Sequence, residues 1–240
     1  MCEREGRRLV TLYEGNSFSL LGDIVKQVDD PVIVTDPPFN IGYHYRTYKD
    51  RRKEAFFYES LAIIFSAVPS VVIMYPEMLH RLSIEMKEAP IDVLTWVYNA
   101  NTAKQHRDVA YYRIKPDLER VRQPYKDMKD KRCIALYERT GGARMYDWFE
   151  CPQVKNKSKD KTAHPCQMPL EVMDKIVGVL PDGVTVIDPF AGSGTTLLAC
   201  AKRGIPCVGI ELDHEYCNII KNRLEDEGFD CEIKVHEEVV

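Results

Sequence analysis

A carboxylate, two prolines and an aromatic ring follow a short apolar run near the start of the chain. The run is residues 31–35 (Pro-Val-Ile-Val-Thr), and Asp36, Pro37, Pro38 and Phe39 come directly after it. Proline fixes φ and removes a backbone donor, so this turn is rigid and presents mainly acceptors, the Asp36 carboxylate and the Pro37 carbonyl. Beside a cofactor site, these acceptors would hold an amine and Phe39 would offer a flat face to a base. Alone, the motif is equally typical of a simple turn.

A glycine-rich turn forms the second motif. Residues 188–196 (Asp-Pro-Phe-Ala-Gly-Ser-Gly-Thr-Thr) follow a predicted strand and open a predicted helix. Glycine lets the backbone pass close to a ligand, and a helix start presents free N–H groups to an anion, so we expect a small cofactor here. The turn lacks both the ending of a phosphate-binding loop and the full dinucleotide spacing, which disfavours nucleoside triphosphates and NAD. We expect a branched side chain at Gly194 to fill space that the ligand needs. The expected contacts are Asp188, Phe190, Ala191, Gly192, Ser193, Gly194 and Thr195.

An acid ends the next predicted strand, about twenty residues after the glycines. Glu211 at this position can accept hydrogen bonds from both ribose hydroxyls, as acids do in doubly wound nucleoside-binding folds. Its other interpretation is an acid favoured by a helix dipole. Because the turn and the acid occur together, we predict ribose binding.

These motifs together resemble the amino-methylating DNA methyltransferases, which have Asp/Ser-Pro-Pro-Tyr/Phe and Asp-Pro-Phe-x-Gly-x-Gly-Thr motifs. The catalytic motif comes first, as in the permuted β class, and residues 164–169 (His-Pro-Cys-Gln-Met-Pro) are similar to the His-Pro-x-Gln-x-Pro element of that group. The resemblance covers nearly the whole chain. It implies an S-adenosylmethionine-dependent enzyme that flips adenine out of DNA and methylates its N6 amine by direct attack. It also implies that His164, Gln167 and Asp36 border the cofactor.

The chain departs from the family pattern at three places. Gly15-Asn16 replaces the usual Gly-Asp, so Asn16 would accept the adenine amine of the cofactor through a neutral amide oxygen. Phe39 replaces the more common Tyr and keeps the stacking face. The recognition segment is shorter than usual. The Asp at position 36 favours adenine, since cytosine-N4 enzymes usually have Ser there.

The periodicity predicts an α/β fold with a mainly parallel, doubly wound sheet, and the resemblance implies a methyltransferase fold with one antiparallel strand and an inserted target-recognition segment. We expect residues 1–240 to form one methyltransferase domain, with 99–162 as the inserted basic segment. We expect the strands that end at Asp36 and Asp188 to be neighbours. Between residues 99 and 131 the periodicity fails, and 139–162 reads as irregular. The predicted strands are 8–13, 31–35, 71–75, 91–98, 133–137, 184–187 and 205–210, and the predicted helices are 17–26, 54–68, 77–88, 170–180, 194–203 and 213–226.

Charge is distributed unevenly along a chain whose net charge is −4. Residues 99–162 have 16 basic and 9 acidic side chains, whereas the segments before and after are both net acidic. A polyanion would therefore be attracted to the middle segment, although a solvated loop has the same composition. The loop after the catalytic motif would close over the flipped base. We expect DNA contacts from Tyr43, Arg46, Arg51, Arg52, Arg113, Arg120, Arg122, Lys155 and Lys157.

Composition excludes several other classes. No run of about 18 uncharged apolar residues occurs, so we expect no membrane span, and the N-terminus lacks a secretory signal, which predicts a cytoplasmic protein. The eight cysteines lack zinc-knuckle spacing, so we expect no metal. A partner restriction endonuclease and a homodimer are expectations by analogy. The open alternatives are cytosine-N4, RNA or protein amine methylation, and a catalytically idle nucleic-acid-binding module.

Overall fold

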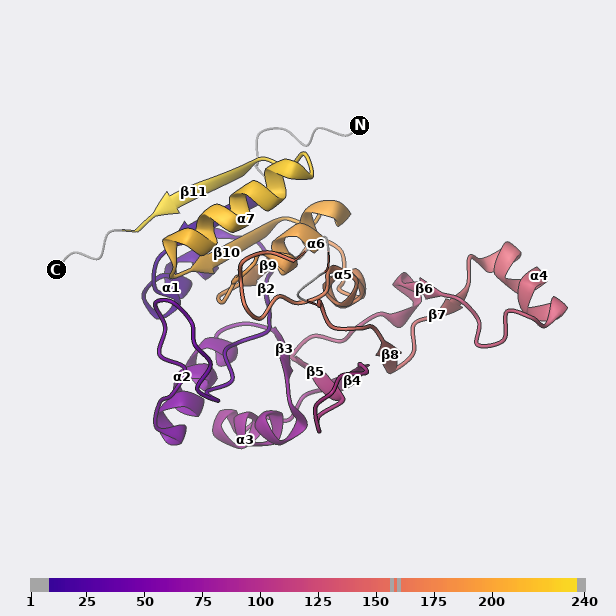
Figure 1. The fold of residues 1–240 in the computed structure, drawn as a ribbon, viewed down its shortest axis with the longest axis horizontal. Coiled ribbons are helices and arrows are strands. Elements are labelled where there is room, and N and C mark those ends of the chain that lie inside the picture. The colour runs from indigo at the N-terminus through magenta and orange to yellow at the C-terminus, as the bar shows by residue number, and fades with distance from the viewer. Residues whose placement is uncertain (1–8, 156–157, 159–160, 237–240) are drawn as a thin grey trace.

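The computed structural model describes residues 9–155, 158 and 161–236. Its centre is a nine-stranded sheet in the order β11-β1-β10-β9-β2-β3-β5-β4-β8 (Figure 1). All neighbouring strands are parallel except that β5 runs antiparallel to β3 and β4, which confirms the mainly parallel sheet with one antiparallel strand. The strands of this sheet are β1 (Val10–Glu14), β2 (Pro31–Thr35), β3 (Ser70–Met74), β4 (Asp92–Val97), β5 (His106–Tyr112), β8 (Trp148–Glu150), β9 (Thr185–Asp188), β10 (Cys207–Glu211) and β11 (Cys231–Val235).

Helices cover both faces of the sheet. One apolar cluster packs three helices from the first half of the chain on one face, and a second cluster packs three helices from the last third on the other. The first three are α1 (Ser17–Gln27), α2 (Glu54–Ser66) and α3 (Pro76–Met86), and the others are α5 (Leu170–Gly178), α6 (Thr195–Arg203) and α7 (His214–Asp226).

The central strands are apolar on both faces because both faces are covered. In β2, Val32 and Val34 point into the cluster with α5–α7, and Ile33 points into the cluster with α1–α3. Side chains alternate between the two faces of a strand, so a strand buried on both faces reads as a continuous apolar run. This is why residues 31–35 were recognisable as a strand.

The prediction that residues 99–131 lack a regular element was wrong for β5. Tyr111 and Tyr112 are fully buried in this strand, which inserts between β3 and β4. The strand begins His106-Arg107-Asp108, and these polar residues concealed its pattern. Of the three, Arg107 reaches the candidate active site described below, His106 is exposed, and Asp108 accepts from the Thr95 hydroxyl.

Residues 133–137 were also assigned wrongly, because they form a helix and not a strand. They belong to α4 (Lys131–Thr140), which the Asp130 side chain caps by accepting from the Arg132 N–H and which ends at Gly141 with φ of 72°. A capping side chain before a short apolar run and a left-handed glycine after it are typical of the two ends of a helix, so the run between them forms a helix and not a strand. The region predicted to be irregular contains β7 and β8, and the edge strand β11 was not predicted.

We call residues 122–144 the arm, because they project from the body of the molecule (Figure 1). The arm consists of β6 (Arg122–Gln123), α4 and β7 (Ala143–Arg144), in which β6 and β7 pair antiparallel, and the 3-10 turn η1 (Leu118–Arg120) precedes it. No residue of α4 is buried. In the part of the chain that the structure describes, no helix is long and apolar enough to cross a membrane.

Candidate active site

The two motifs meet because β2 and β9 are neighbouring parallel strands, which confirms that the strands ending at Asp36 and Asp188 lie side by side. The Thr35 hydroxyl donates to Asp188 Oδ1 at 2.6 Å, and the Phe190 N–H donates to the same oxygen at 3.1 Å. Asp188 is buried, which raises the pKa of its carboxyl. Asp188 therefore acts as a brace that joins the two loops.

A cavity of about 380 Å³ lies at the carboxyl ends of β1, β10, β9 and β2. This is the size of a small-molecule site and the usual position for one in an open α/β sheet. Gly194, Gln167, Arg46 and Arg51 are not among the residues that line it. The predicted residues that line it are Asn16, Asp36, Pro37, Pro38, Phe39, Tyr43, Arg52, His164, Asp188, Phe190, Ala191, Gly192, Ser193, Thr195 and Glu211.

The glycine-rich turn is held to the end of β10 by Glu211. Its Oε2 accepts from the Gly192 N–H at 2.8 Å, and its Oε1 accepts from the Asp213 N–H at 2.9 Å. Burial raises the pKa of Glu211 to about 7, although these backbone donors act in the opposite direction. Gly192 has φ of 54°, and a Cβ there would come within 3.1 Å of His164 Nε2. Glycine is thus required at this close approach.

Gly194 has a different role from the one predicted. Its φ is 72°, and a Cβ would lie 2.9 Å from Cγ2 of Ile220 in α7, whereas we expected it to enter the ligand space. Gly194 precedes the first turn of α6, where the chain must pass closely under α7. The residue is therefore needed for packing of the fold.

Asn16 and His164 border the cavity from two sides. Asn16 caps α1 by accepting from the Phe18 N–H at 3.0 Å. The His164 ring lies 4.6 Å from the Tyr216 ring, and burial, assisted by the positive charge of Lys161, lowers the pKa of His164 to about 4. Its imidazole is neutral at pH 7, and its buried Nδ1 has no partner among the described residues. Gln167 lies behind the cavity and accepts from the Thr162 N–H at 2.7 Å.

Asp36 is mostly buried and pairs with a cation that the sequence analysis missed. Nη1 of Arg107, in β5, lies 3.0 Å from Asp36 Oδ2. Burial raises the pKa of Asp36 to about 6, and Arg107 limits this rise. The Arg107 guanidinium carbon also lies 4.8 Å from the centre of the Phe39 ring. Only a correct assignment of β5 could have indicated this contact.

The loop of residues 40–53 is folded around a second residue that the sequence analysis missed. Asp50 is 2% exposed, and its carboxylate accepts from the N–H groups of Asn40 at 2.7 Å, Ile41 at 3.1 Å and Tyr43 at 2.9 Å. Hydrogen bonds to a carboxylate are strong, so they fix the loop. The loop brings Tyr43, along with other aromatic side chains, to the wall of the cavity.

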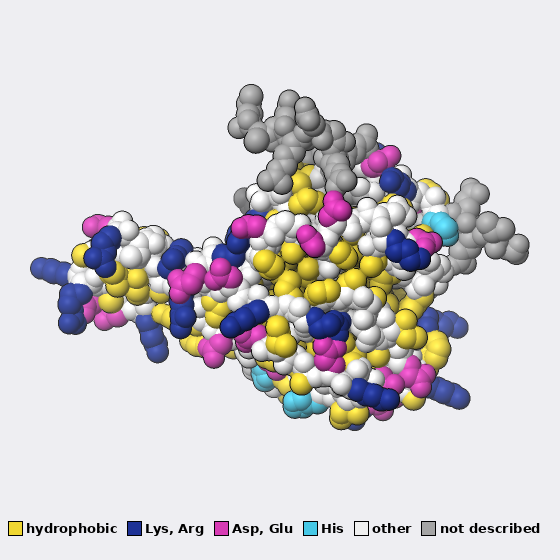
Figure 2. Space-filling view, turned by 180° about the vertical axis from the view of Figure 1, so that it is seen from behind, with side chains coloured by type: hydrophobic (Ala, Val, Ile, Leu, Met, Phe, Trp, Pro, Cys, Tyr) yellow, Lys and Arg dark blue, Asp and Glu magenta, His cyan; other side chains and the backbone are white. Residues whose placement is uncertain are grey.

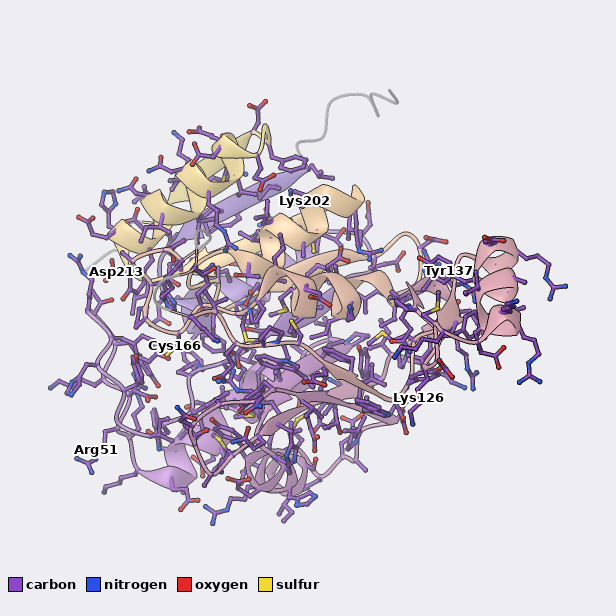
Figure 3. All side chains as sticks on the ribbon, turned by 45° about the vertical axis from the view of Figure 1, so that its right-hand side comes forward. Arg51, Lys126, Tyr137, Cys166, Lys202 and Asp213 are labelled. Atoms are coloured by element: carbon purple, nitrogen blue, oxygen red, sulfur yellow. The ribbon has the colours of Figure 1, made fainter. Side chains whose placement is uncertain are left out.

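The middle of the same loop is fastened to Asp213, the residue that caps α7. The Thr47 hydroxyl donates to Asp213 Oδ2 at 3.1 Å, and Arg46 lies 3.7 Å from the same oxygen. Figure 3 shows Asp213, Cys166 and Arg51 along one side of the molecule, with this loop between them. Arg52 stacks on Tyr48 at 5.1 Å and on Phe56 at 5.6 Å.

Two of the predicted DNA contacts lie at the edge of the sheet where the parallel strands begin. Arg113 follows the far end of β5, donates to the Val68 carbonyl at 2.7 Å and pairs with Glu88. Arg120 pairs with Asp182, just before β9. The antiparallel strand β5 ends, and the parallel strand β9 begins, at the edge of the sheet opposite the carboxyl ends of the parallel strands. Both arginines are therefore distant from those carboxyl ends. Both residues are exposed, and each is held against the body of the protein by an ion pair.

The remaining predicted DNA contacts are exposed or not described. Arg46, Arg51 and Lys155 are exposed, and so is Arg122 at the base of the arm, 3.4 Å from Glu119. Lys157 lies outside the described residues. Figure 2 shows Lys and Arg side chains gathered at the end of the arm.

Comparison with known proteins gives relatives along nearly the whole chain. M.ScaI, a Type II methyltransferase of Streptomyces caespitosus, is 28% identical over 261 residues, which cover 91% of this chain and 82% of that protein. The structure of M1.HpyAVI complexed with SAM has a TM-score of 0.60 at 22% identity, covering 90% of this chain and 98% of that one. The cytosine-N4-specific PvuII DNA methyltransferase has a TM-score of 0.58 at 13% identity, covering 95% and 98%.

The structural likeness shows the fold of S-adenosylmethionine-dependent DNA methyltransferases, and the family follows from the sequence. A family model described as DNA methylase, covering N6 and N4 methyltransferases, matches residues 31–222. That range includes Asp36 and its prolines, the arm, the glycine-rich turn and Glu211. The chain therefore belongs to the N6/N4 DNA methylase family.

Proposed function

We propose that this protein is a site-specific methyltransferase that transfers the methyl group of S-adenosylmethionine to the N6 amine of adenine in DNA. The observation that carries the proposal is one continuous cavity lined by both Asp36 and the Gly192–Glu211 pair. An amine acceptor and a nucleoside site are thus within reach of each other. Direct transfer between two bound molecules requires this proximity.

The residues present fit S-adenosylmethionine. Glu211 stands where it can accept ribose hydroxyls, and the Gly192 turn leaves room where a Cβ would crowd His164. His164 is neutral, with an unpartnered Nδ1 among the described residues, so it can serve a polar group of the ligand. Asn16 lines the cavity at the end of β1, where the cofactor's adenine amine would need an acceptor. The cofactor supplies an electrophilic methyl group on a sulfonium.

Asp36, Pro37, Pro38 and Phe39 would receive the flipped base. The amine lone pair of adenine is conjugated into the ring, so the nitrogen is a weak nucleophile. Hydrogen bonds from the amine to the Asp36 carboxylate and the Pro37 carbonyl return electron density to the nitrogen. The nitrogen would then bond to the methyl carbon as the sulfur–carbon bond breaks, with S-adenosylhomocysteine as the leaving group and the surplus amine proton passing to solvent. Flipping costs a few kcal/mol, which stacking on Phe39 partly offsets.

DNA would be held by the arm and by the exposed basic side chains of the 40–53 loop. The arm contains seven Lys or Arg and three Asp or Glu. Phosphate contacts dominate the affinity of such surfaces and make it depend on salt. We infer that the arm supplies most of these contacts.

The second candidate base is cytosine, methylated at N4. The likeness to the cytosine-N4-specific PvuII enzyme favours keeping this candidate. Asp at position 36 favours adenine by the family pattern, and the same acceptors would suit either exocyclic amine. An idle binding module would have no use for the Asp36 carboxylate and the cofactor turn within one cavity.

Labelled S-adenosylmethionine and mixed-sequence DNA test the proposal. We expect mass spectrometry of the digested DNA to detect N6-methyladenine. Asp36→Ala should lower transfer by about a hundredfold or more, the scale for loss of one preorganised contact to the reacting group, and should change cofactor affinity only a few fold. N4-methylcytosine as sole product would refute the choice of base. Equal losses of transfer and of cofactor binding would refute the role of Asp36.

We also propose that the protein forms a homodimer and works beside a restriction endonuclease, and that it is cytoplasmic. The first two rest on the family resemblance. Light scattering of the purified protein tests the dimer, and a neighbouring gene whose product cuts only unmethylated DNA of the same sequence tests the partner.

A further inference from the structure

Arg107 belongs to none of the sequence motifs, yet it lines the cavity beside Asp36 and Phe39. It is the second residue of β5, and the antiparallel course of β5 brings this residue to the edge where β2 and β3 end. The Arg107 side chain is 14% exposed, as is that of Asp36. A charged side chain with so little exposure needs a partner of opposite charge.

Aromatic rings hold the Arg107 guanidinium in place. Its carbon lies 4.8 Å from the centre of the Phe39 ring and 5.5 Å from those of Tyr75 and Trp96. Trp96 is itself fixed, because its Nε1 donates to the Cys151 carbonyl at 2.7 Å. Arginine on aromatic faces is both stacked and attracted electrostatically, so the position of the cation is well defined.

Arg107 is the cation that acts on Asp36 among the described residues. The groups that face the carboxyl from the neighbouring elements are Arg107 of β5, Asp188 of β9, and Tyr45 and Cys166 from the loops. Tyr75 and Tyr98 face the far side of the guanidinium. Asp188 opposes ionisation of Asp36, as does burial. Without Arg107, all of these influences would favour a neutral Asp36.

The contact leaves room on the carboxylate for a second donor. A single nitrogen, Nη1, reaches both oxygens, at 3.2 and 3.0 Å. An ionised carboxylate has about four acceptor positions, so some remain for an amine. Protonation of Asp36 would replace one acceptor by an O–H donor and would oppose the approach of the amine.

We propose that Arg107 is a positioning residue that keeps Asp36 ionised and oriented to accept the target amine. The inference rests on the proposed function, because the amine is the group that Asp36 serves. It assigns a role in the reaction to β5, a strand that lies outside both motifs.

Two neutral variants and one charged variant test the proposal. An opposite charge at this distance shifts the pKa of a carboxyl by about 1 to 3 units. For a shift of about 2 units from about 6, Arg107→Met and Arg107→Gln should transfer methyl about tenfold more slowly at pH 7 and within about twofold of the wild type at pH 9. Arg107→Lys keeps a positive charge beside Asp36, so its transfer rate should fall toward low pH (the acid limb of the pH profile) as that of the wild type does. Rates are measured in a single turnover at saturating cofactor and DNA.

The control is Lys104→Met. Lys104 also lies over the Tyr75 ring, at 4.1 Å, but on the exposed side and in a pair with Glu77. Its loss should leave the acid limb unchanged. Equal slowing of Arg107→Gln at every pH, with a native melting curve, would overturn the proposal, because a merely structural role predicts that result.

Carbon-13 NMR of labelled aspartate gives a readout that needs no substrate. The pKa of the Asp36 carboxyl should be about 6 in the wild-type protein and higher in Arg107→Gln. An unchanged pKa would overturn the proposal even if the rates fall. A raised pKa in a protein that methylates no DNA would support the electrostatic role of Arg107 and would locate the failure in the proposed function.

Discussion

Cofactor affinity should rise with pH because of Glu211. Burial raises the pKa of this carboxyl to about 7, and ribose hydroxyls are donors that need the ionised form. Binding therefore favours the carboxylate, and affinity increases as pH rises through 7 and levels off above it. About a tenth of the carboxyl is ionised at pH 6 and about nine tenths at pH 8, which predicts an affinity about tenfold lower at pH 6.

Glu211→Gln removes both the charge and its titration. Hydrogen bonds to charged groups contribute about 1.5–3 kcal/mol, so we expect affinity at pH 8 to fall by about one to two orders of magnitude. The amide oxygen can still accept from one of the two N–H groups that now bond to Glu211, those of Gly192 and Asp213. The variant should therefore remain folded, which a melting curve checks.

Isothermal titration calorimetry at pH 6 and pH 8 measures both effects. The cofactor's own amine has a pKa in this region, but it titrates alike with either protein, so the difference between wild type and variant isolates Glu211. If both proteins show the same pH dependence, Glu211 is not the titrating group and its assignment to the ribose is refuted.

Two further predictions concern the fold and the DNA surface. Gly194→Ala should lower the free energy of unfolding by about 2–4 kcal/mol in a denaturant titration, because of its positive φ and the contact of the new Cβ with Ile220. The control Gly183→Ala, with φ of 87° and open space around it, should lower it by only about 1 kcal/mol. Equal losses of stability in the two variants would contradict the packing role of Gly194. Replacing three exposed lysines of the arm should make the slope of log affinity against log salt concentration shallower by up to about three. Replacing three exposed lysines outside the arm should leave that slope unchanged. An unaltered slope in fluorescence anisotropy would remove the arm from the DNA surface. The arm lysines are Lys126, Lys129 and Lys131, and the controls are Lys26, Lys115 and Lys202.

The sequence alone was sufficient for features whose chemistry lies in contiguous residues. The Asp-Pro-Pro-Phe turn, the glycine-rich turn and Glu211 each stand at the carboxyl end of an apolar strand, as the sequence predicted. A strand covered on both faces is apolar at every position, so β2 and β9 were readable, and the order of elements implied that they meet.

Tertiary structure alone decided the contacts between distant segments. Arg107 reaches Asp36 across 71 positions, and Asp213 holds the 40–53 loop at Thr47 across 166 positions. β5 was missed because it begins with three polar residues, Arg107 of the site among them, and α4 was misassigned because five apolar residues suit either a strand or a helix until their caps are considered. Gly194 was read as a ligand contact because its sequence context cannot show that Ile220 lies against it. The local sequence reflects the requirements of the helix or strand to which a residue belongs, whereas the residues that it contacts in other elements depend on how those elements pack.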